Sequence, residues 1–371
     1  MKMIRVLQVV PSLNINSGMM SVVMNYYREI DRSKIQFDFL YFGEMAESHQ
    51  KEIEVLGGRT FYMKRPTFKP QDQRRLNVFF EKHKGEYIAV HCHPIWVSAV
   101  VAHAAKKSGI HHIIQHAHST QYSEKRISAI RNCILVKFIS LFATDYIACN
   151  DEAAQLIGAR RAEKKQVFIL PNAINLKKYE FNENSRNKIR QEFGASPEMA
   201  LLGSVGRLSV EKNQCFIVEI FKEFHERNPQ SMLILVGDGA LRRQIENEIS
   251  KLRLKDSVIL TGKRTDVGAI LSALDVFIMP SVFEGTPVSA IEARASGLPC
   301  LLSDTITRSV DMREMTYLSI KEPPLVWAQE AEKQMINNRD NNRYDYAEVI
   351  SHGFDIKVEA IKLQEYYLGL R

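Results

Sequence analysis

Short apolar runs alternate with amphipathic helical stretches along most of the chain, and this alternation constrains the fold more than any other feature of the sequence. The strand-like runs of the first half are Ile4–Val10, Phe37–Phe42, Ile88–His91, His112–His116 and Tyr146–Cys149. The helical stretches between them are Met20–Ile30, Asp72–Lys82 and Ser98–Ser108. A strand, a helix and a second strand in succession form the unit of a parallel sheet, so the first half is predicted to be an α/β domain with a doubly wound sheet.

The alternation pauses once and then restarts. The short run Val167–Leu170 is followed by Pro171-Asn172, a turn typical of a link between domains. The later strand-like runs are Ala200–Val205, Met232–Val236, Val258–Leu260, Val276–Met279 and Pro299–Leu302. The later helical stretches are Asn182–Phe193, Gln214–Arg227, Ala240–Leu252, Ala269–Leu274, Pro287–Ala295 and a terminal amphipathic stretch, Asp355–Leu370. The 371 residues exceed the roughly 250–300 that one core serves, so two doubly wound units are predicted, divided near residues 171–176.

Positive charge is concentrated in the first half of the chain. The formal net charge is +7, with a balance of +9 over residues 1–170 and −2 over the remainder. A basic half favours an anionic partner, and an anionic membrane, a phosphorylated substrate and a nucleic acid all remain candidates at this stage.

The compartment follows from what the sequence lacks. No apolar run reaches about 18 residues, so no transmembrane helix is expected, and the strand-like start does not have the pattern of a secretory signal. The five cysteines are dispersed without a Cys-x-x-Cys pair, which indicates reduced thiols and a cytosolic address.

The first motif with chemical content is Gly203-Ser204-Val205-Gly206-Arg207, followed by Lys212. It lies between a predicted strand and a predicted helix, where glycines let the backbone approach an anion and the helix N-terminus directs N–H groups toward it. Arg207 adds a planar fork for phosphate oxygens and Lys212 a point charge. The motif indicates either a diphosphate site or an ordinary turn with two solvated cations.

The second motif is a pair of carboxylates separated by seven residues, in Glu284-Gly285-Thr286-Pro287-Val288 and on to Glu292. Pro287 suits the first turn of a helix, which places Glu284 in the preceding loop and Glu292 about a turn and a half into the helix. Carboxylates at such a position suit a ligand rich in hydroxyl groups. An isolated pair would more often be a surface glutamate and a helix glutamate.

Histidines are crowded into one part of the first half. Seven of the 11 lie between residues 91 and 118, and His91-Cys92-His93 and His116-Ala117-His118 each end an apolar run. Alternate residues of a strand share a face, so each pair is able to converge. A metal site with Cys92 as a further ligand is one interpretation, but few carboxylates are near and pairs on separate strands need not meet. A catalytic or substrate-orienting His118 is favoured, and the other histidines are expected to be structural.

The loop from Pro11 to Met19 joins the first strand to the first helix and could bind a phosphate or an acceptor. Gly18 is its one glycine, so it is a weak dinucleotide fingerprint, and no Gly-x₄-Gly-Lys-Ser/Thr element occurs anywhere, which excludes a P-loop NTPase.

The order of these motifs resembles the donor half of a GT-B glycosyltransferase of family 4. The resemblance rests on GSVGRLSVEKN, LILVGDGALR, ILTGKRTDV and FEGTPVSAIEA in this order. The first half, with SGMMSVVMNYYREID, the two histidine pairs and LPNAINLKKY, is similar to bacterial glycosyltransferases of capsule and exopolysaccharide synthesis, of the group 1 type. The resemblance covers essentially the whole chain.

The resemblance implies two Rossmann-like domains facing a cleft. The acceptor-side domain would comprise residues 1–171 and be joined by the C-terminal helix, residues 355–371, while residues 172–354 would bind the donor. It implies retaining transfer of a hexose from a nucleotide-diphosphate sugar, with UDP-hexose or UDP-N-acetylhexosamine expected, and neither a catalytic metal nor another cofactor.

The resemblance also implies roles for individual residues. Arg207 and Lys212 would bind the diphosphate and stabilise the leaving group, with Gly206 beside them. Glu292 would hold the ribose hydroxyls and Glu284 the donor sugar. His118 would lie by the donor sugar, with His116 as the alternative. The further binding residues implied are Gly285, Thr286, Pro287 and Val288 near the sugar, Gly262, Lys263 and Arg264 near the base, and Gly18 near the phosphates and the acceptor.

One departure from the family concerns the early loop, where paired glycines are usual and this chain has Ser17-Gly18. Ser17 carries a Cβ that limits the closest backbone approach, and function is expected to survive because Gly18 remains. The segment Thr305-Ile306-Thr307 has no interpretable motif.

The expected acceptor is a saccharide, carried on a polyprenyl diphosphate at the membrane. Basic stretches with interleaved aromatic residues, from Phe61–Arg65 to Arg74-Arg75 and over Lys125–Lys137, would then lie on anionic lipid, or else be solvated helix faces. The expected location is cytoplasmic, peripheral on the inner face of the cell membrane. The basic residues form no known nucleic-acid-binding motif, so no nucleic-acid partner is expected.

Two other functions compete with this interpretation. A nucleotide-sugar epimerase or sugar-phosphate transferase would share the fold but carry a different acid–base constellation. A non-catalytic partner subunit related to a transferase would have no need of Arg207, Lys212, Glu284 and Glu292 together.

Overall fold

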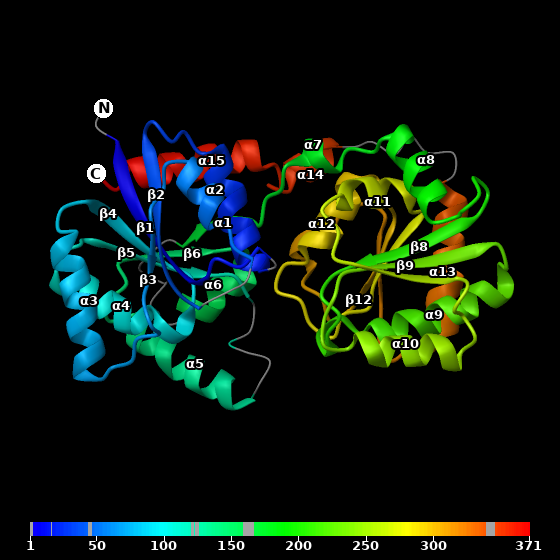
Figure 1. Cartoon of the computed structure of the whole chain (residues 1–371), viewed down its shortest axis with the longest axis horizontal. Coiled ribbons are helices and arrows are strands. Elements are labelled where there is room, and N and C mark those ends of the chain that lie inside the picture. Colours follow the sequence, from blue (N-terminus) through cyan, green and yellow to red (C-terminus); the bar gives the residue numbers. More distant parts are fainter. Residues whose placement is uncertain are drawn as a thin grey trace. The chain divides into compact units, whose positions relative to one another are not determined.

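The computed structural model describes residues 3–15, 17–43, 47–119, 122, 126–158, 167–338 and 346–371. The chain divides into two compact units (Figure 1). The first comprises Met1–Ala173 together with Ile356–Arg371, and the second comprises Ile174–Asp355. The last helix therefore belongs to the same unit as the N-terminus, although almost the whole chain separates them.

The first unit is built on a seven-stranded sheet with the order β3-β2-β1-β4-β5-β6-β7, in which every recorded pairing is parallel. Its strands are β1 (Ile4–Ser12), β2 (Ile35–Gly43), β3 (Thr60–Tyr62), β4 (Tyr87–Cys92), β5 (His112–Ala117), β6 (Asp145–Ala148) and β7 (Phe168–Ile169). The central strands are buried on both faces, as expected where helices cover a parallel sheet.

The helices of the first unit are α1 (Gly18–Glu29), α2 (Gln50–Val55), α3 (Pro70–Lys82), α4 (Ile95–Lys107), α5 (Arg126–Ile139), α6 (Asp151–Gly158) and the C-terminal α15 (Ile356–Leu368). Ser17 caps the N-terminus of helix α1, and its hydroxyl accepts a hydrogen bond from Met20 N (3.4 Å). Helix α15 packs against α1. It buries Leu363 and Tyr367 within this unit, so the end of the chain completes the fold of its beginning.

The second unit has a six-stranded sheet with the order β10-β9-β8-β11-β12-β13, again with only parallel pairings recorded. Its strands are β8 (Ala200–Val205), β9 (Ser231–Val236), β10 (Val258–Gly262), β11 (Val276–Met279), β12 (Cys300–Ser303) and β13 (Met315–Leu318). Two apolar clusters, one on each side of the sheet, make up its core.

The helices of the second unit are α7 (Leu176–Tyr179), α8 (Glu183–Glu192), α9 (Gln214–Arg227), α10 (Arg242–Lys251), α11 (Val267–Ala273), α12 (Val288–Ala295), α13 (Pro324–Asn338) and α14 (Tyr346–Ser351), with the 3₁₀ turns η2 (Val210–Lys212) and η3 (Arg308–Val310). No helix within the described residues is both long and apolar enough to cross a membrane.

In both sheets the strand order reverses next to the first strand of the unit. In the first, β1 lies between β2 and β4, and in the second, β8 lies between β9 and β11. Ligands of open α/β sheets bind beyond the carboxyl ends of the strands at this reversal. The predicted α/β class with two doubly wound parallel sheets is confirmed, and the reversal directs attention to the segments that follow β4, β5, β8 and β11.

Several elements of the structure were not predicted from the sequence. The edge strands β3 and β13 are only three and four residues long, too short to give an alternating pattern. Helices α5, α13 and α14 were also missed. Pro287 was predicted to open the helix after β11, but it is the N-cap, and α12 begins at Val288.

Candidate functional site

Three turns follow neighbouring strands of the second unit and are joined by backbone hydrogen bonds. Gly206 N donates to Val236 O (3.0 Å), and Gly237 N donates to Gly262 O (2.9 Å). A Cβ on Gly237 would lie only 2.0 Å from the carbonyl oxygen of Gly206, and one on Gly239 only 2.3 Å from that of Leu208. Glycine is therefore required for these turns to pack together at the carboxyl ends of β8, β9 and β10.

Lys212 lies over the first of these turns. A Cβ on Gly206 would be 3.3 Å from Lys212 Cε, so the absence of a side chain at Gly206 makes room for the lysine stem. Lys212 Nζ forms an ion pair with Glu284 Oε1 at 2.6 Å, and both side chains are largely withdrawn from solvent. The structure thus brings together a lysine and a glutamate that are 72 positions apart in the sequence and that sequence reasoning assigned to one site.

The loop that carries Glu284 is held on two sides. Val282 N donates to Glu211 O (2.8 Å), and Asn213 Nδ2 donates to Pro280 O (3.2 Å), which ties the loop to the turn of Lys212. On the other side, Thr305 Oγ1 donates to Ser281 O (2.8 Å), and Glu284 forms an isolated parallel bridge with Ile306. The segment 305–307, which had no interpretable motif, therefore supports the glutamate loop.

Glu292 lies in the middle of α12 and is partly buried. Tyr179, from the short helix α7, donates its hydroxyl to Glu292 Oε1 at 2.5 Å. Burial raises the pKa of the Glu292 carboxyl to about 7, while the Tyr179 hydrogen bond and the charges of Lys178 and Lys212 oppose this rise. Lys212 is thus electrostatically coupled to both carboxylates of the predicted pair.

The other predicted cations have different surroundings. The Arg207 side chain is 71% exposed, and its guanidinium is 3.8 Å from Glu211 Oε1. Arg264 is engaged by Glu192 (2.5 Å) and Asp266 (2.7 Å), which together raise the pKa of its guanidinium further above its ordinary value. Arg207 is therefore exposed to solvent, whereas the Arg264 guanidinium is already paired with two carboxylates of the same unit.

The remaining predicted residues of this unit lie in two loops. Gly262 ends β10 with φ +70°, a conformation that favours glycine, and exposed Lys263 follows it. Gly285 and Thr286 lie between Glu284 and the start of α12, where Pro287 O accepts from Ala290 N (2.9 Å) and Val288 is the first helical residue.

In the first unit, Gly18 is the first residue of α1. A Cβ at Gly18 would meet no heavy atom within 4 Å, so the packing of the protein does not itself require glycine there. Ser17, the departure from the paired glycines of the family, has a role of its own as the N-cap of α1.

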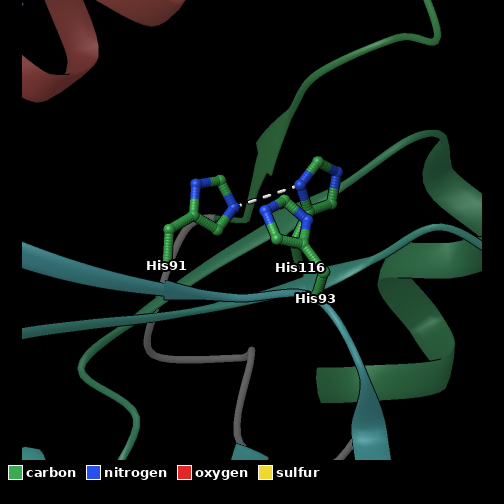
Figure 2. A group of neighbouring side chains, drawn as sticks. All are labelled: His91, His93 and His116. Carbon is green, nitrogen blue, oxygen red and sulfur yellow. Dashed lines mark hydrogen bonds between the residues drawn. The ribbon is translucent and has the colours of Figure 1, made fainter. Parts of the chain in front are cut away.

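The two histidine pairs meet, contrary to the reservation that pairs on separate strands need not. Strands β4 and β5 are neighbours in the sheet, and His91 and His93 at the end of β4 contact His116 and His118 at the end of β5. His91 Nε2 is 3.1 Å from His116 Nδ1, and His93 Nδ1 is 2.7 Å from His118 Nε2. Figure 2 shows His91, His93 and His116 side by side, with the hydrogen bond between His91 and His116.

The histidine cluster also has donors and acceptors from elsewhere in the first unit. His91 Nδ1 is 2.6 Å from the hydroxyl of Tyr367 on α15, and His93 Nε2 is 2.8 Å from Gln8 Oε1 on β1. Sequence reasoning missed both partners. The apolar period of the C-terminal helix included Tyr367. Gln8 interrupts the apolar run of β1 between Leu7 and Val9, and this polar residue in a buried strand is the one available signal.

Burial shifts the pKa of every member of the cluster downward. The pKa of His91 falls to about 3 and that of His118 to about 4, and those of His93 and His116 are also well below their ordinary value. Withdrawal from water is the largest cause in each case, and the neighbouring imidazoles add to it for His91, His93 and His116. The four rings are therefore neutral at physiological pH.

The ring nitrogens of His91, His93 and His116 lie within 4.8 Å of one another, so these three residues could hold a metal ion. Cys92, which was considered as a further ligand, is wrong for this role because alternate residues face opposite sides of the sheet. It is buried in the apolar cluster with Leu7 and Val97, where burial raises the pKa of its thiol to about 12. The rings also form hydrogen bonds with one another, so their close approach is explained without a metal ion.

Comparison with known proteins identifies the family. The profile of the family described as glycosyl transferases group 1 matches residues 185–315. EpsF, a presumed glycosyltransferase of Bacillus subtilis, is 33% identical over 359 residues, which cover 95% of this chain and 93% of EpsF. A galactosyltransferase of Escherichia coli, named UDP-Gal:alpha-D-GlcNAc-diphosphoundecaprenol alpha-1,3-galactosyltransferase, is 28% identical over 229 residues, covering 60% of this chain and 59% of that protein.

Solved structures support the same fold. HepE from Anabaena, crystallised in complex with UDP, superimposes with a TM-score of 0.79 at 17% identity, over 99% of this chain and 100% of HepE. Sucrose-phosphate synthase from Thermosynechococcus elongatus also gives a TM-score of 0.79, at 18% identity and over 99% of both chains. Together with the two parallel-sheet units and the near full-length similarity to EpsF, these findings show that the chain belongs to the group 1 glycosyltransferases and has the GT-B fold.

Proposed function

We propose that the protein is a retaining, metal-independent hexosyltransferase of capsule or exopolysaccharide synthesis. Its donor would be UDP-hexose or UDP-N-acetylhexosamine, and its acceptor a saccharide carried on a polyprenyl diphosphate. The observation that carries the proposal is the ion pair of Lys212 with Glu284 above the glycine turns of the second unit. The name of the Escherichia coli relative supports the donor and acceptor classes, since it specifies UDP-Gal, an undecaprenyl-diphosphate-linked GlcNAc and an alpha linkage.

Arg207 and Lys212 would bind the two phosphates of the donor. During transfer, the bond from the anomeric carbon to the UDP oxygen breaks and its electron pair leaves with UDP. The acceptor oxygen forms the new bond on the same face of the sugar, and its proton leaves with the diphosphate. Two positive charges at the diphosphate stabilise the charge that develops there, which is the contribution that a bound metal would otherwise make. This argument supports metal independence.

The two carboxylates would bind different parts of the donor. Glu284 would accept hydrogen bonds from the sugar hydroxyls, with the backbone of Gly285–Val288 nearby, and Glu292 would accept from the ribose hydroxyls. The raised pKa of Glu292 suits this role, because hydroxyl groups of a ligand replace water around a carboxylate that the protein has desolvated. The backbone of Gly262–Arg264 would line the base.

His118 would lie at the donor sugar and Gly18 at the phosphates and the acceptor. His118 follows β5 and has one ring nitrogen, Nδ1, without a hydrogen-bond partner in the described part of the chain. Gly18 has open space where a Cβ would point, which a ligand could use. Both observations support ligand contacts at these residues.

A membrane-facing surface on α5 would bring the enzyme to a lipid-linked acceptor. Apolar side chains recur along α5 and just beyond it at helical spacing, and they are 48–65% exposed: Ile130, Ile134, Phe138 and Leu141. Exposed Arg131 and Lys137 lie among them. Arg65 packs over Trp96 (4.0 Å). Burial and the nearby charge of Arg131 lower the pKa of the Arg65 guanidinium, so two guanidinium groups are close together.

Such a surface, apolar and basic at once, suits an anionic bilayer, and we therefore propose peripheral attachment at the cytoplasmic face of the membrane. Lys125 of the predicted basic stretch lies outside the described residues. We propose no nucleic-acid partner, because the exposed cations lie among apolar side chains and form no recognised binding motif.

A calorimetric titration with UDP, GDP, ADP and UDP-sugars, repeated in EDTA, tests the donor assignment. The expected result is that UDP and one UDP-hexose bind, that EDTA leaves this binding unchanged, and that Lys212→Ala weakens it. Transfer to a synthetic polyprenyl-diphosphate saccharide then separates an enzyme from the non-catalytic partner subunit, which could bind nucleotide but would not turn over. Binding of none of the nucleotides would contradict the proposed site.

A further inference from the structure

Six polar residues of the first unit are joined in one hydrogen-bonded chain, which we call the histidine relay. They are Gln8, His91, His93, His116, His118 and Tyr367. The side-chain amide of Gln8 lies at its centre: Oε1 is 2.8 Å from His93 Nε2, and Nε2 is 3.2 Å from the Tyr367 hydroxyl. Two branches therefore start from one amide group.

The four imidazole rings of the relay are neutral. Gln8, His91, His93 and His116 are at most 4% exposed, and the bonds recorded within the relay join imidazoles, an amide and a phenol, with no carboxylate among them. A charged imidazolium in this position would have two N–H donors and would lose solvation without a counter-charge. Each ring consequently has one N–H donor and one bare nitrogen acceptor, so the two contacts of His91, and likewise those of His93, must have opposite directions.

The first branch runs from Gln8 to His118. Gln8 Oε1 can only accept, so His93 carries its proton on Nε2 and leaves Nδ1 as an acceptor. His118 must then donate from Nε2 to His93 Nδ1 (2.7 Å). The branch ends at His118 Nδ1, a buried acceptor that has no partner in the described part of the chain.

The second branch runs from Gln8 through Tyr367 to His116. Gln8 Nε2 donates to the Tyr367 oxygen, so the Tyr367 proton is directed to His91 Nδ1 (2.6 Å). His91 then donates from Nε2 to His116 Nδ1 (3.1 Å). This branch ends at the Nε2–H of His116, a buried donor without a partner among the described residues.

The orientation of one amide group thus determines four tautomers. With the Gln8 amide in this orientation, all four histidines carry the proton on Nε2. A rotated Gln8 amide would reverse every bond and give four Nδ1–H rings. In either case the two ends of the relay have opposite character. A cavity about the size of one water molecule is lined by His116, Gln8 and Tyr26, among others.

We propose that Gln8 and Tyr367 are positioning residues which hold the four histidines in a common Nε2–H tautomer, so that His118 presents a bare Nδ1 to the substrate. The link to substrate rests on the proposed role of His118 at the donor sugar. A bare Nδ1 accepts a hydrogen bond from a sugar hydroxyl and has no proton to give, so His118 orients the sugar and is not a general acid. The C-terminal helix α15 then serves the site through Tyr367 as well as the fold.

The tautomers can be measured without any substrate. Long-range proton–nitrogen correlation spectra of protein labelled with ¹⁵N-histidine distinguish Nε2–H, Nδ1–H and charged rings, and single histidine substitutions assign the signals. At pH 7 we expect the Nε2–H pattern at His91, His93, His116 and His118. Mixed tautomers, a charged ring or a common Nδ1–H pattern would overturn the proposal, as would metal-shifted signals that EDTA abolishes.

The matched variants are Tyr367→Phe and Tyr366→Phe, neighbours on α15. Tyr367→Phe removes the hydroxyl that joins the two branches, so the tautomers of His91 and His116 should no longer follow those of His93 and His118. The Tyr366 hydroxyl has no partner in the described part of the chain, so Tyr366→Phe should leave all four patterns unchanged. Identical spectra for Tyr367→Phe and the unsubstituted protein would contradict the coupling.

Turnover provides the link to function. We expect kcat to fall roughly fivefold in Tyr367→Phe, the size of one net hydrogen bond, with the donor KM nearly unchanged. An altered tautomer pattern with unchanged kcat would overturn the link to the site. If the protein transfers no sugar at all, the spectra still decide whether the relay exists, so failure of the proposed function and failure of the relay are distinct results.

Discussion

Lys212 Nζ lies 2.6 Å from Glu284 Oε1, and the two side chains are 22% and 13% exposed. A positive charge is therefore already held in place above the glycine turns. Its partner is a carboxylate, whose negative charge would repel the diphosphate of the proposed donor. Replacing either member of this pair should therefore change the affinity for UDP in a different way.

Lys212→Ala should weaken UDP binding by roughly 10- to 100-fold and lower turnover by about 10²- to 10³-fold, because it removes a charge-assisted contact and leaves Glu284 facing the diphosphate. Glu284→Ala should lower turnover but retain UDP binding. In the Glu284→Ala background, Lys212→Ala should cost less UDP affinity than in the unsubstituted protein. Isothermal titration of the two single variants and the double variant measures this difference, and strictly additive losses would argue against the competition.

Gly237→Ala should destabilise the fold, whereas Gly18→Ala should leave its stability nearly unchanged. A Cβ at Gly237 would lie 2.0 Å from the Gly206 carbonyl oxygen at a φ of +134°, so Gly237→Ala should lower the free energy of unfolding by a few kcal/mol. Gly18→Ala, at the start of a helix with open space around it, should change it by less than about 0.5 kcal/mol. Denaturant titration checks both values.

The same Gly18→Ala variant tests the proposed ligand contact. If a phosphate or acceptor approaches this part of the backbone, turnover should fall although stability is retained. Unchanged kcat and KM for both substrates would remove Gly18 from the site.

Glu292 should make donor binding depend on pH. The pKa of its carboxyl is raised to about 7, so the carboxylate proposed to accept from the ribose hydroxyls is fully formed only above this pH. UDP-glucose affinity should rise with pH between about 5.5 and 7.5, by at most roughly tenfold per unit, and then level off. UDP-glucose is the suitable probe because its phosphates do not titrate there, whereas the terminal phosphate of UDP does. Glu292→Gln should abolish the dependence, and Tyr179→Phe should move its midpoint upward.

The free energy of unfolding should also depend on the ionisation of Glu292, but it should fall as the pH rises, whereas donor affinity should increase. Between the ordinary carboxyl pKa of 4.5 and about 7, native Glu292 retains a proton that the unfolded chain has released. Its contribution to the free energy of unfolding therefore decreases as the pH rises through this window. Comparison of the unsubstituted protein with Glu292→Gln by denaturant titration at pH 5, 6, 7 and 8 isolates this contribution.

His118→Ala should act on turnover, lowering kcat by roughly 10- to 100-fold while UDP affinity changes by less than about threefold, because the sugar and not the nucleotide is its proposed partner. His103 on α4 is exposed and lies outside the histidine relay, so His103→Ala is the matched control and should retain full activity. A large loss of UDP binding in His118→Ala would place His118 at the nucleotide instead.

Replacing Ile134 and Phe138 together by serine should weaken attachment to vesicles of anionic phospholipid, while vesicles of neutral lipid should bind neither protein well. These side chains are 50% and 48% exposed on α5. Ile336 in the second unit is 64% exposed and gives the control variant Ile336→Ser. Vesicle sedimentation measures attachment. Equal binding of the α5 variant and the control would show that α5 is not the membrane surface.

Local patterns in the sequence were sufficient for most of the second unit. The predicted bounds of β8 (Ala200–Val205), α9 (Gln214–Arg227) and β11 (Val276–Met279) coincide with those in the structure, because continuous apolar runs and an amphipathic helix carry their signal in neighbouring residues. The glycines of the turns and the seven-residue spacing of Glu284 and Glu292 are local in the same sense. The roles assigned to these residues stay predictions until the variants are measured.

The edge strand β3 and the histidine contacts needed the tertiary structure. A strand of three residues has no periodicity of its own and exists through pairing with β2. The histidine pairs meet because β4 and β5 are adjacent, a fact of strand order that no spacing within one pair contains. The same order places β1 beside β4, which brings Gln8 to His93.

The sequence by itself determined two doubly wound α/β units, their glycine turns and the residues that could carry charge to a diphosphate, because each of these is encoded by residues close together in the chain. The tertiary structure alone decided which of those residues touch. Tyr367 reaches His91 across 276 positions and Tyr179 reaches Glu292 across 113. Such contacts arise from the packing of whole elements, since burial of apolar faces fixes where a helix lies and only then where its polar side chains point.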